Sequence, residues 1–416
     1  MKILLAHYKY YVQGGPERYM LKFTELAEKN GHKVVPFAVR YDRNIENKYS
    51  RYFPNGSNSS GMYDPNDKNL GYLLRGAYLE FHNRDARKKL KKLIDDENPD
   101  VLYCLIPGEL TPDIFKIAKK KGVPCILRLS DFRLLCGKMN LLRGENICEE
   151  CIHGKYLCMV KHKCVKDSAL VSCLRMLSLY YSKICNRYKY VDAVIAPPRF
   201  TAKKFIEASY FPEEKVFINP TFIDCSQIEV SSVFKPYVLC LGRFTLEKGF
   251  IYVVEAMKHL QDIPVTVAVT GDRNGCSPEL EALIEKYNLE DKITFVGFLH
   301  GEALEKIINE SLCIACPAIW YENMPNTVLE AYAYGKPVIA SNIGSLAEIV
   351  EDGVTGLLFD PKNSKQIADC IRKLYEAPEL CMRLGKQGRK MCETVYSPQR
   401  HWNNFMSIYE EIKKEK

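Results

Sequence analysis

Two successive series of alternating strand and helix segments constrain the fold of this 416-residue chain more than any other feature. The first series opens with an apolar strand at residues 2–6, a helix with a Gly-rich start at 14–31, and a second strand at 32–39. A second series begins with the apolar segment at 237–243 and ends in a helix near residue 377. Strands that alternate with helices form parallel sheets covered by helices. The sequence therefore predicts an α/β protein with two Rossmann-like domains that face each other across a cleft.

The two series meet near residues 222–236. This junction predicts an N-terminal domain over 1–222 and a C-terminal domain over 223–397, in keeping with the two domains that the chain length suggests. A Cys-rich stretch at about 136–164 interrupts the first series, and one more helix at about 398–416 follows the completed second sheet.

The composition is that of an ordinary folded protein, with 47% hydrophobic and 26% charged residues. The apolar run that follows Lys2 is too short for a signal peptide. No segment approaches the ~18 apolar residues that span a bilayer. We therefore expect a cytoplasmic protein. In that compartment most of the 17 cysteines would be reduced and buried.

The net charge of +8 hides a difference between the two halves. Residues 1–210 carry 37 Lys and Arg against 22 Asp and Glu, which gives +15, whereas residues 211–416 carry 22 against 29, which gives −7. A basic N-terminal half could attract nucleic acid, an anionic membrane or an acidic acceptor.

The predicted cleft lies beyond the carboxyl ends of the parallel strands, where open α/β sheets bind their ligands. Residues at strand ends and helix starts are therefore the candidates for the site. They are Gly14, Gly15, Ser130, Asp131, Gly242, Arg243, Lys248, Gly271, Asp272, Gly297 and the segment 321–330.

Two cations and a glycine pair in this set suit a diphosphate. Arg243 directly follows a strand and Lys248 directly precedes a helix, so both can converge with a helix N-terminus on one anion. Gly14 and Gly15 would let the backbone approach a phosphate closely. The alternatives are a solvated loop with two ordinary cations and a Gly-Gly turn that serves packing alone.

Two carboxylates flank the Asn-Met-Pro-Asn turn of the second domain. If a helix starts near Asn326 or Thr327, Glu330 lies about one turn inside it and Glu322 stands before it at the cleft rim. A carboxylate accepts paired hydrogen bonds from vicinal hydroxyls, so Glu330 suits a ribose and Glu322 a hexose. Two solvated surface acids are the alternative.

Three motifs together resemble the retaining glycosyltransferases of family 4, which have the GT-B fold. They are GGPERY at 14–19, GRFTLEKG at 242–249, and the E-x7-E pair of Glu322 and Glu330 followed by LEAYAYGKPVIAS. Each motif is loose by itself, but they occur in the family's order across nearly the whole chain. The resemblance implies transfer of a hexose from a UDP- or GDP-linked sugar to a saccharide or lipid-linked acceptor, as in surface polysaccharide or glycolipid synthesis.

The resemblance also assigns roles. Arg243 and Lys248 would bind the donor diphosphate and stabilise the leaving group, Glu330 would hold the ribose, and Glu322 would hold the transferred sugar. The remaining donor contacts would come from the Gly15 amide, from the loop residues Met324, Pro325, Asn326 and Thr327, from the neighbouring Gly14, Gly242 and Gly271, and from Gly297 near the nucleobase.

The implied reaction needs neither a side-chain nucleophile nor a metal at its centre. The family is generally metal-independent there, and this chain has no Asp-x-Asp pair, so cations and helix dipoles would stabilise the charge. One departure concerns Ser130, which precedes Asp131 where many relatives have His. Ser130 would be a weaker sugar contact or, with Asp131, a structural cap.

The resemblance extends to the acceptor side. The family's last helix commonly packs back on the first domain, which would account for the helix at 398–416. The basic face of Lys88, Lys89, Lys91 and Lys92 would then suit an anionic membrane, with the enzyme peripheral on its inner face, or would simply be solvated. A non-catalytic interaction protein and a nucleotide-sugar epimerase are the alternative functions.

The Cys-rich stretch carries a possible structural zinc site. Cys148 and Cys151 form a C-x2-C pair that suits one tetrahedral thiolate site, with His153 and His162 nearby. The resemblance to a branch of the family with such an insert implies Cys136, Cys148, Cys151 and Cys164 as ligands and leaves Cys158 out. Free or redox-active thiols are the alternative.

Overall fold

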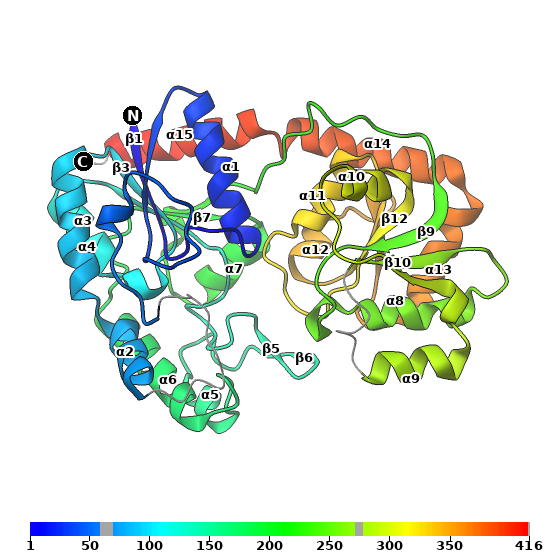
Figure 1. The fold of residues 1–416 in the computed structure, drawn as a ribbon, viewed down its shortest axis with the longest axis horizontal. Coiled ribbons are helices and arrows are strands. Elements are labelled where there is room, and N and C mark those ends of the chain that lie inside the picture. The colour runs from blue at the N-terminus through cyan, green and yellow to red at the C-terminus, as the bar shows by residue number, and fades with distance from the viewer. Residues whose placement is uncertain (59–69, 271–277, 415–416) are drawn as a thin grey trace.

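The computed structural model describes residues 1–58, 70–270 and 278–414. Two six-stranded sheets with parallel neighbours dominate it, each covered by helices (Figure 1). The predicted pair of Rossmann-like domains is confirmed, and the architecture is a GT-B fold. No helix in the described ranges is long and apolar enough to cross a membrane.

The N-terminal sheet has the strand order β2-β1-β3-β4-β7-β8. Its strands are β1 (Lys2–His7), β2 (Lys33–Phe37), β3 (Val101–Ile106), β4 (Cys125–Arg128), β7 (Ala193–Ala196) and β8 (Val216–Ile218). The helices of this half are α1 (Gly15–Lys29), α2 (Leu70–Phe81), α3 (Arg84–Glu97), α4 (Asp113–Lys120), α5 (Leu157–Lys161), α6 (Ala169–Ile184) and α7 (Arg199–Glu207).

The C-terminal sheet has the order β11-β10-β9-β12-β13-β14. Its strands are β9 (Lys235–Cys240), β10 (Thr266–Val269), β11 (Ile293–Phe295), β12 (Ser311–Cys316), β13 (Val338–Ser341) and β14 (Gly356–Phe359). The helices are α8 (Phe250–Ala256), α9 (Pro278–Tyr287), α10 (Gly301–Glu310), α11 (Asn326–Ala333), α12 (Gly344–Ile349), α13 (Ser364–Glu376) and α14 (Pro378–Thr394).

Buried strands explain why each sheet is covered on both faces. Successive side chains of a strand point to opposite faces, so Leu4 of β1 lies in one core cluster while Ile3 and Leu5 lie in another. Apolar side chains on both faces require helices on both faces. The packed helices hold the sheet in place, and with it the carboxyl ends of the strands, where the loops toward the second domain begin.

The last helix, α15 (Pro398–Lys414), belongs to the core of the N-terminal half. Trp402 and Phe405 pack with Phe23 of α1 and Tyr103 of β3. The chain thus crosses between the halves twice, and the two crossings meet where the Ile223 amide donates to the Tyr396 carbonyl oxygen at 2.9 Å.

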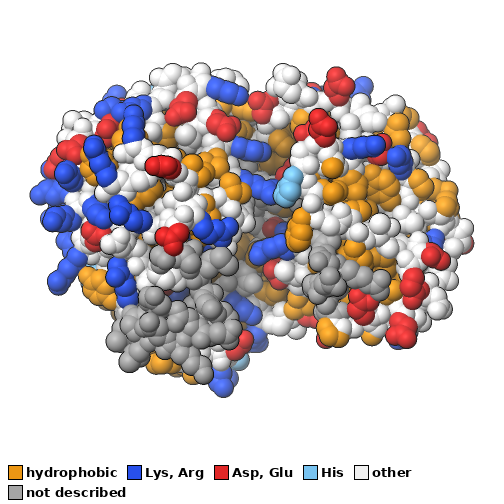
Figure 2. Space-filling model, in the orientation of Figure 1, with side chains coloured by type: hydrophobic (Ala, Val, Ile, Leu, Met, Phe, Trp, Pro, Cys, Tyr) orange, Lys and Arg blue, Asp and Glu red, His pale blue; other side chains and the backbone are white. Residues whose placement is uncertain are grey.

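The Cys-rich stretch is an irregular extension of the N-terminal half. It contains a short antiparallel hairpin of β5 (Leu142–Arg143) and β6 (Asn146–Ile147), followed by α5. The hairpin reaches the other half of the molecule, where Glu145 accepts from the Tyr252 hydroxyl at 3.1 Å and lies 3.4 Å from the Lys362 ammonium. Figure 2 shows a hollow between the two halves and many Lys and Arg side chains on the N-terminal one.

Candidate functional site

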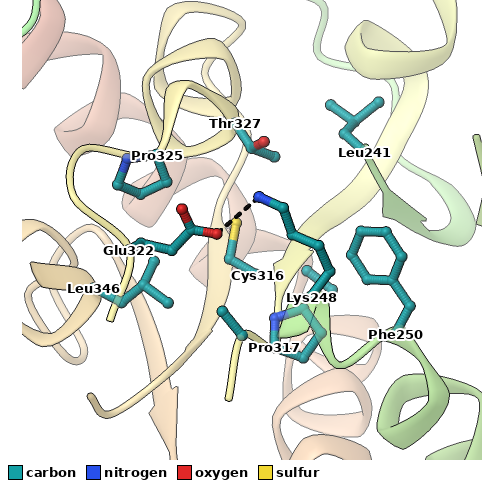
Figure 3. Close-up of a pocket in the computed structure, with 11 residues that line it drawn as sticks. Leu241, Lys248, Phe250, Cys316, Pro317, Glu322, Pro325, Thr327 and Leu346 are labelled. Atoms are coloured by element: carbon teal, nitrogen blue, oxygen red, sulfur yellow. Dashed lines mark hydrogen bonds and ion pairs between the residues drawn. The ribbon is translucent and has the colours of Figure 1, made fainter. Parts of the chain in front are cut away.

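Two of the predicted residues, Lys248 and Glu322, form an ion pair in a pocket of the C-terminal half. Lys248 Nζ donates to Glu322 Oε1 at 2.7 Å (Figure 3). The Trp320 indole N–H donates to the same oxygen at 3.1 Å. The pocket is lined by Leu241, Lys248, Phe250, Ala315, Cys316, Pro317, Ala318, Glu322, Pro325, Thr327 and Leu346.

Strand topology brings this pair together across 74 residues of sequence. The chain reaches Lys248 shortly after β9, and it reaches Glu322 shortly after β12, the strand that neighbours β9. Gly249 makes the approach possible, because its φ is +67° and a Cβ there would lie 2.0 Å from the Pro317 carbonyl oxygen. Any other residue at Gly249 would push the Lys248 loop away from Glu322.

The electrostatics favour the charged form of Lys248. Burial of its ammonium alone would lower the pKa of Lys248, but the charge of Glu322 and its hydrogen bond outweigh burial and raise the pKa. Arg243 is exposed, and its charge is close enough to act in the opposite direction on the pKa of Lys248. Lys248 is therefore a cation at the pocket with N–H donors left for a ligand, and Arg243 is a second cation near it.

Glu330 lies close to this pair. The helix that carries it begins at Asn326, as predicted, so Glu330 stands one turn inside α11. Burial raises the pKa of the Cys316 thiol to about 12, and the charges of Lys248, Glu322 and Glu330 all act on that thiol. The charges of these three predicted residues therefore all act on one buried side chain.

The start of α1 faces the start of α11 from the opposite half. Arg18 Nη1 lies 3.8 Å from Glu330 Oε1, and a Cβ built on Gly15 would lie 3.5 Å from the Asn326 side-chain nitrogen. The Gly14 amide donates to Glu17 Oε2 at 2.8 Å and so serves the helix start. Gly15, at the N-terminus of the 15-residue α1, is the glycine that faces the second domain.

The predicted Ser130 and Asp131 lie in a separate pocket of the N-terminal half. The Asp131 carboxylate accepts from the Arg133 guanidinium at 2.6 Å and from the Arg133 amide at 2.9 Å, and the Ser130 hydroxyl donates to the Leu105 carbonyl oxygen at 3.3 Å. Both residues line a pocket that also contains Arg128 and Arg133. The local bonds of Ser130 and Asp131 are those of a structural turn beside the cleft.

The other predicted donor contacts are spread along the C-terminal half. The Gly242 amide donates to the Thr270 hydroxyl at 2.9 Å, and Gly297 has a φ of +72° in the loop after β11. Met324 is half-buried between Glu322 and the start of α11. Gly271 and Asp272 lie outside the described residues.

Both neighbours of Glu322 lie in the predicted segment 321–330, but their contacts with the N-terminal half were not predicted. The Tyr321 ring meets Phe200 edge-on at a centroid distance of 4.7 Å and hydrogen-bonds Glu149. The Asn323 amide donates to the Leu129 carbonyl oxygen at 2.9 Å, and its oxygen accepts from the Thr201 hydroxyl at 2.7 Å. The N-terminal half therefore holds Glu322 on either side.

A buried pair beneath the Gly-rich turn was also missed. His7 and Glu17 are both buried, with 3.1 Å between His7 Nε2 and Glu17 Oε1. Burial lowers the pKa of His7, and the hydrogen bond from His7 helps to lower the pKa of Glu17 despite its burial. A neutral His7 thus donates to a charged Glu17 that caps the helix start.

The Cys-rich insert does not form a metal site as described. Burial, with the charges of the other four insert thiols, raises the pKa of Cys151 to about 12, so these thiols are neighbours. In the described ranges, however, no three His, Cys, Asp or Glu side chains are arranged to hold a metal ion. The proposed zinc ligands Cys136, Cys148, Cys151 and Cys164 would have to move closer together, and the structure gives no reason to leave out Cys158. Elemental analysis of chelator-washed protein would support the zinc prediction if it found one zinc per chain and would remove it if it found none.

A comparison with known protein families finds a match for the segment that carries the ion pair. The model of the family described as "Glycosyl transferases group 1" matches residues 226–391, which include Lys248, Glu322 and Glu330. About two fifths of the chain is therefore similar to group 1 glycosyltransferases.

Curated relatives align over part of the chain. An alpha-D-kanosaminyltransferase of Streptomyces kanamyceticus is 29% identical over 43% of this chain and 46% of its own length. A 2-deoxystreptamine N-acetyl-D-glucosaminyltransferase of Niallia circulans is 27% identical over 44% of this chain and 48% of its own length. The chain thus spans about half of the length of these relatives.

Solved structures are similar over the whole chain. A glycosyltransferase from Rickettsia africae superposes with a TM-score of 0.69 at 19% identity, over 100% of this chain and 99% of that one. HepE from Anabaena, in complex with UDP and glucose, superposes with a TM-score of 0.64 at 16% identity and the same coverage. At these identities the likeness concerns the fold, and it covers both halves of the chain.

Proposed function

We propose that the protein is a retaining glycosyltransferase of family 4 that moves a hexose from a UDP- or GDP-linked sugar to a saccharide or lipid-linked saccharide. The observation that carries this proposal is the Lys248–Glu322 ion pair at the carboxyl edge of the second sheet, followed by α11 with Glu330 one turn inside it. A cation paired with one acid, and a second acid one turn inside the next helix, suit a ligand that carries both an anionic group and hydroxyl groups.

The residues divide the donor between them. Lys248 and Arg243 bind the diphosphate, and the N-terminus of α1 at Gly15 adds backbone N–H groups and a favourable dipole from the opposite domain. Glu330 accepts hydrogen bonds from the ribose, and Glu322 accepts them from the sugar. The exposed ring of Phe298, next to Gly297, is the surface on which the base stacks.

In the proposed reaction, the bond between the anomeric carbon and the diphosphate oxygen breaks, and the nucleoside diphosphate leaves with the electron pair. An acceptor hydroxyl oxygen forms the new bond on the same face of the sugar. Its proton passes to an oxygen of the departing phosphate. Lys248 and Arg243 stabilise the charge that develops on that phosphate, so the chain needs no side-chain nucleophile.

Product formation with a panel of donors tests this proposal. The protein is incubated with UDP- and GDP-sugars, and release of the free nucleoside diphosphate is measured with and without saccharide acceptors. We expect release from one donor class and its loss in Lys248→Ala. Thermal stabilisation by the same donor would follow, because a ligand at a hundredfold excess over its Kd adds about 2.7 kcal/mol.

Two results would contradict the glycosyltransferase proposal. Binding of a nucleotide sugar without release of nucleoside diphosphate would indicate a non-catalytic protein. Conversion of the bound sugar to an epimer, with the diphosphate intact, would indicate the epimerase.

A further inference from the structure

The exposed apolar side chains of the N-terminal domain are concentrated on α5 and α6. Of the 13 exposed large hydrophobic residues in the described ranges, four lie on these two helices. They are Leu157, Leu170, Leu177 and Ile184, with 66%, 73%, 47% and 79% of their surface exposed. We propose that this α5–α6 surface docks on an anionic lipid membrane.

The three residues of α6 form one stripe along the helix. Leu170, Leu177 and Ile184 are spaced by seven residues, which returns each to almost the same side of an α-helix. The opposite side of α6 is buried through residues such as Leu179, and the Tyr156 ring before α5 packs edge-on against Tyr180 of α6 at 5.0 Å. The stripe is thus held outward on a well-packed support.

Lysines surround the stripe. Residues 155–189 contain eight Lys or Arg and a single acid. The exposed lysines include Lys155, Lys161, Lys163, Lys183 and Lys189. Apolar side chains that enter the interface and lysines that reach lipid headgroups are the two attractions that hold peripheral proteins on anionic membranes.

The basic face of α3, which the sequence favoured for this contact, lacks the apolar component. In α3 the apolar side chains Leu90, Leu93 and Ile94 are buried in the core. Lys89 also pairs with Asp85 at 3.1 Å. The structure therefore points to α5–α6 as the membrane surface, with α3 contributing charge alone.

Charge complementarity selects the occupant. A second copy of the chain would place these lysines against one another, whereas an anionic leaflet neutralises them. Each lysine near such a leaflet strengthens binding about fivefold. In Figure 1, α5 and α6 lie together at the lower end of the N-terminal domain, beside α2.

Vesicle flotation of the full chain tests the proposal. Vesicles of phosphatidylcholine alone are compared with vesicles that also contain phosphatidylglycerol, at low and high salt. We expect binding to the mixed vesicles that salt weakens. Leu177→Ser combined with Ile184→Ser should weaken this binding at least about tenfold, and Lys161→Glu combined with Lys183→Glu should do the same.

Met382→Ser is the matched control, because Met382 is an exposed apolar residue of the C-terminal domain with 52% of its surface exposed. It should bind vesicles as the unchanged protein does. Equal binding to both kinds of vesicle, unaltered binding of the two double variants, or a dimer that depends on Leu177 and Ile184 would overturn the proposal. Nucleoside diphosphate release in solution should persist in all variants, so the docking surface and the proposed reaction can fail separately.

Discussion

At the scale of single residues, the account depends on the charge of the Lys248–Glu322 pair. Glu322 is 12% exposed and Lys248 is 25% exposed, so either partner alone would be a poorly solvated charge. A pair of this kind costs free energy when one member is removed and much less when both are removed. The Lys248–Glu322 pair holds the Lys248 ammonium at a fixed position.

Glu322→Gln tests the sugar-binding role. We expect kcat to fall about a hundredfold, because the amide keeps the size of the side chain but loses its charge and one acceptor for the sugar hydroxyls. The Kd for the free nucleoside diphosphate should stay nearly constant. Glu330→Gln is the matched control, since it should raise KM and the nucleotide Kd while kcat changes little; the reverse pattern would exchange the two roles.

A double-mutant cycle measures the pair itself. Lys248→Ala should lower the free energy of unfolding by about 1–3 kcal/mol, because it leaves the mostly buried Glu322 carboxylate without its cation and with the weaker Trp320 hydrogen bond. The double variant Lys248→Ala, Glu322→Ala should lose less than the sum of the two single changes. Additive losses in urea unfolding would show that the two side chains are not coupled.

At the scale of elements, α15 joins the C-terminal end of the chain to the N-terminal core through His401. Its Nδ1–H donates to the Pro220 carbonyl oxygen at 2.7 Å, so its Nε2 accepts from the Tyr19 hydroxyl at 2.9 Å. Burial, helped by the charge of Arg128, lowers the pKa of His401 to about 3. The connection between the helix and the domain linker therefore requires a neutral imidazole.

The lowered pKa of His401 predicts how the free energy of unfolding depends on pH. Between the ordinary His pKa of about 6.5 and the folded value of about 3, the unfolded chain binds a proton that the folded chain does not. The free energy of unfolding should therefore fall by about 1.4 kcal/mol for each pH unit below 6.5 from this group. His401→Gln should show a flatter pH dependence in urea unfolding than the control His259→Gln; equal slopes would contradict the assignment.

Local sequence patterns predicted most strands and helices but not α14. The alternating strands and helices are local patterns, and so are the spacing of Glu322 and Glu330 and the start of α11. Helix α14 was missed because Gly385 and Gly388 disfavour a helix locally. In the fold these glycines are required, since a Cβ on Gly385 would lie 1.9 Å from the Gly335 carbonyl oxygen.

The contacts of Tyr321 and Asn323 were beyond sequence reasoning for a different reason. Their partners Phe200, Thr201 and Leu129 precede them by more than 120 residues and lie in the other domain. No local pattern records such a pairing. The roles of Ser130 and of the Cys-rich insert likewise depend on three-dimensional neighbours.

At the scale of the whole molecule, the two domains meet at the loop that carries Glu322. Besides the contacts of Tyr321 and Asn323, the Glu348 carboxylate of α12 accepts from the Arg199 and Phe200 amides at the start of α7, at 2.8 and 2.7 Å. The N-terminal domain thereby fixes the loop that carries Glu322. The contacts between the domains and the position of Glu322 are therefore coupled.

Tyr321→Ala tests this coupling. We expect kcat to fall about tenfold, because loss of an aromatic pair of about 0.5–1.5 kcal/mol frees the loop beside Glu322. Tyr321→Phe should restore most of the rate, since the ring still meets Phe200. Phe200→Ala, on the other domain, should reproduce the loss; unchanged turnover in both alanine variants would show that the interdomain contact does not position Glu322.

The most direct test of the central claim is a crystal structure of the protein with a UDP- or GDP-linked sugar bound. The account predicts the diphosphate within hydrogen-bond distance of Lys248 Nζ, the ribose hydroxyls at Glu330, the sugar hydroxyls at Glu322, and the start of α1 opposite. A donor bound elsewhere in the molecule, or bound with its diphosphate remote from Lys248, would contradict it.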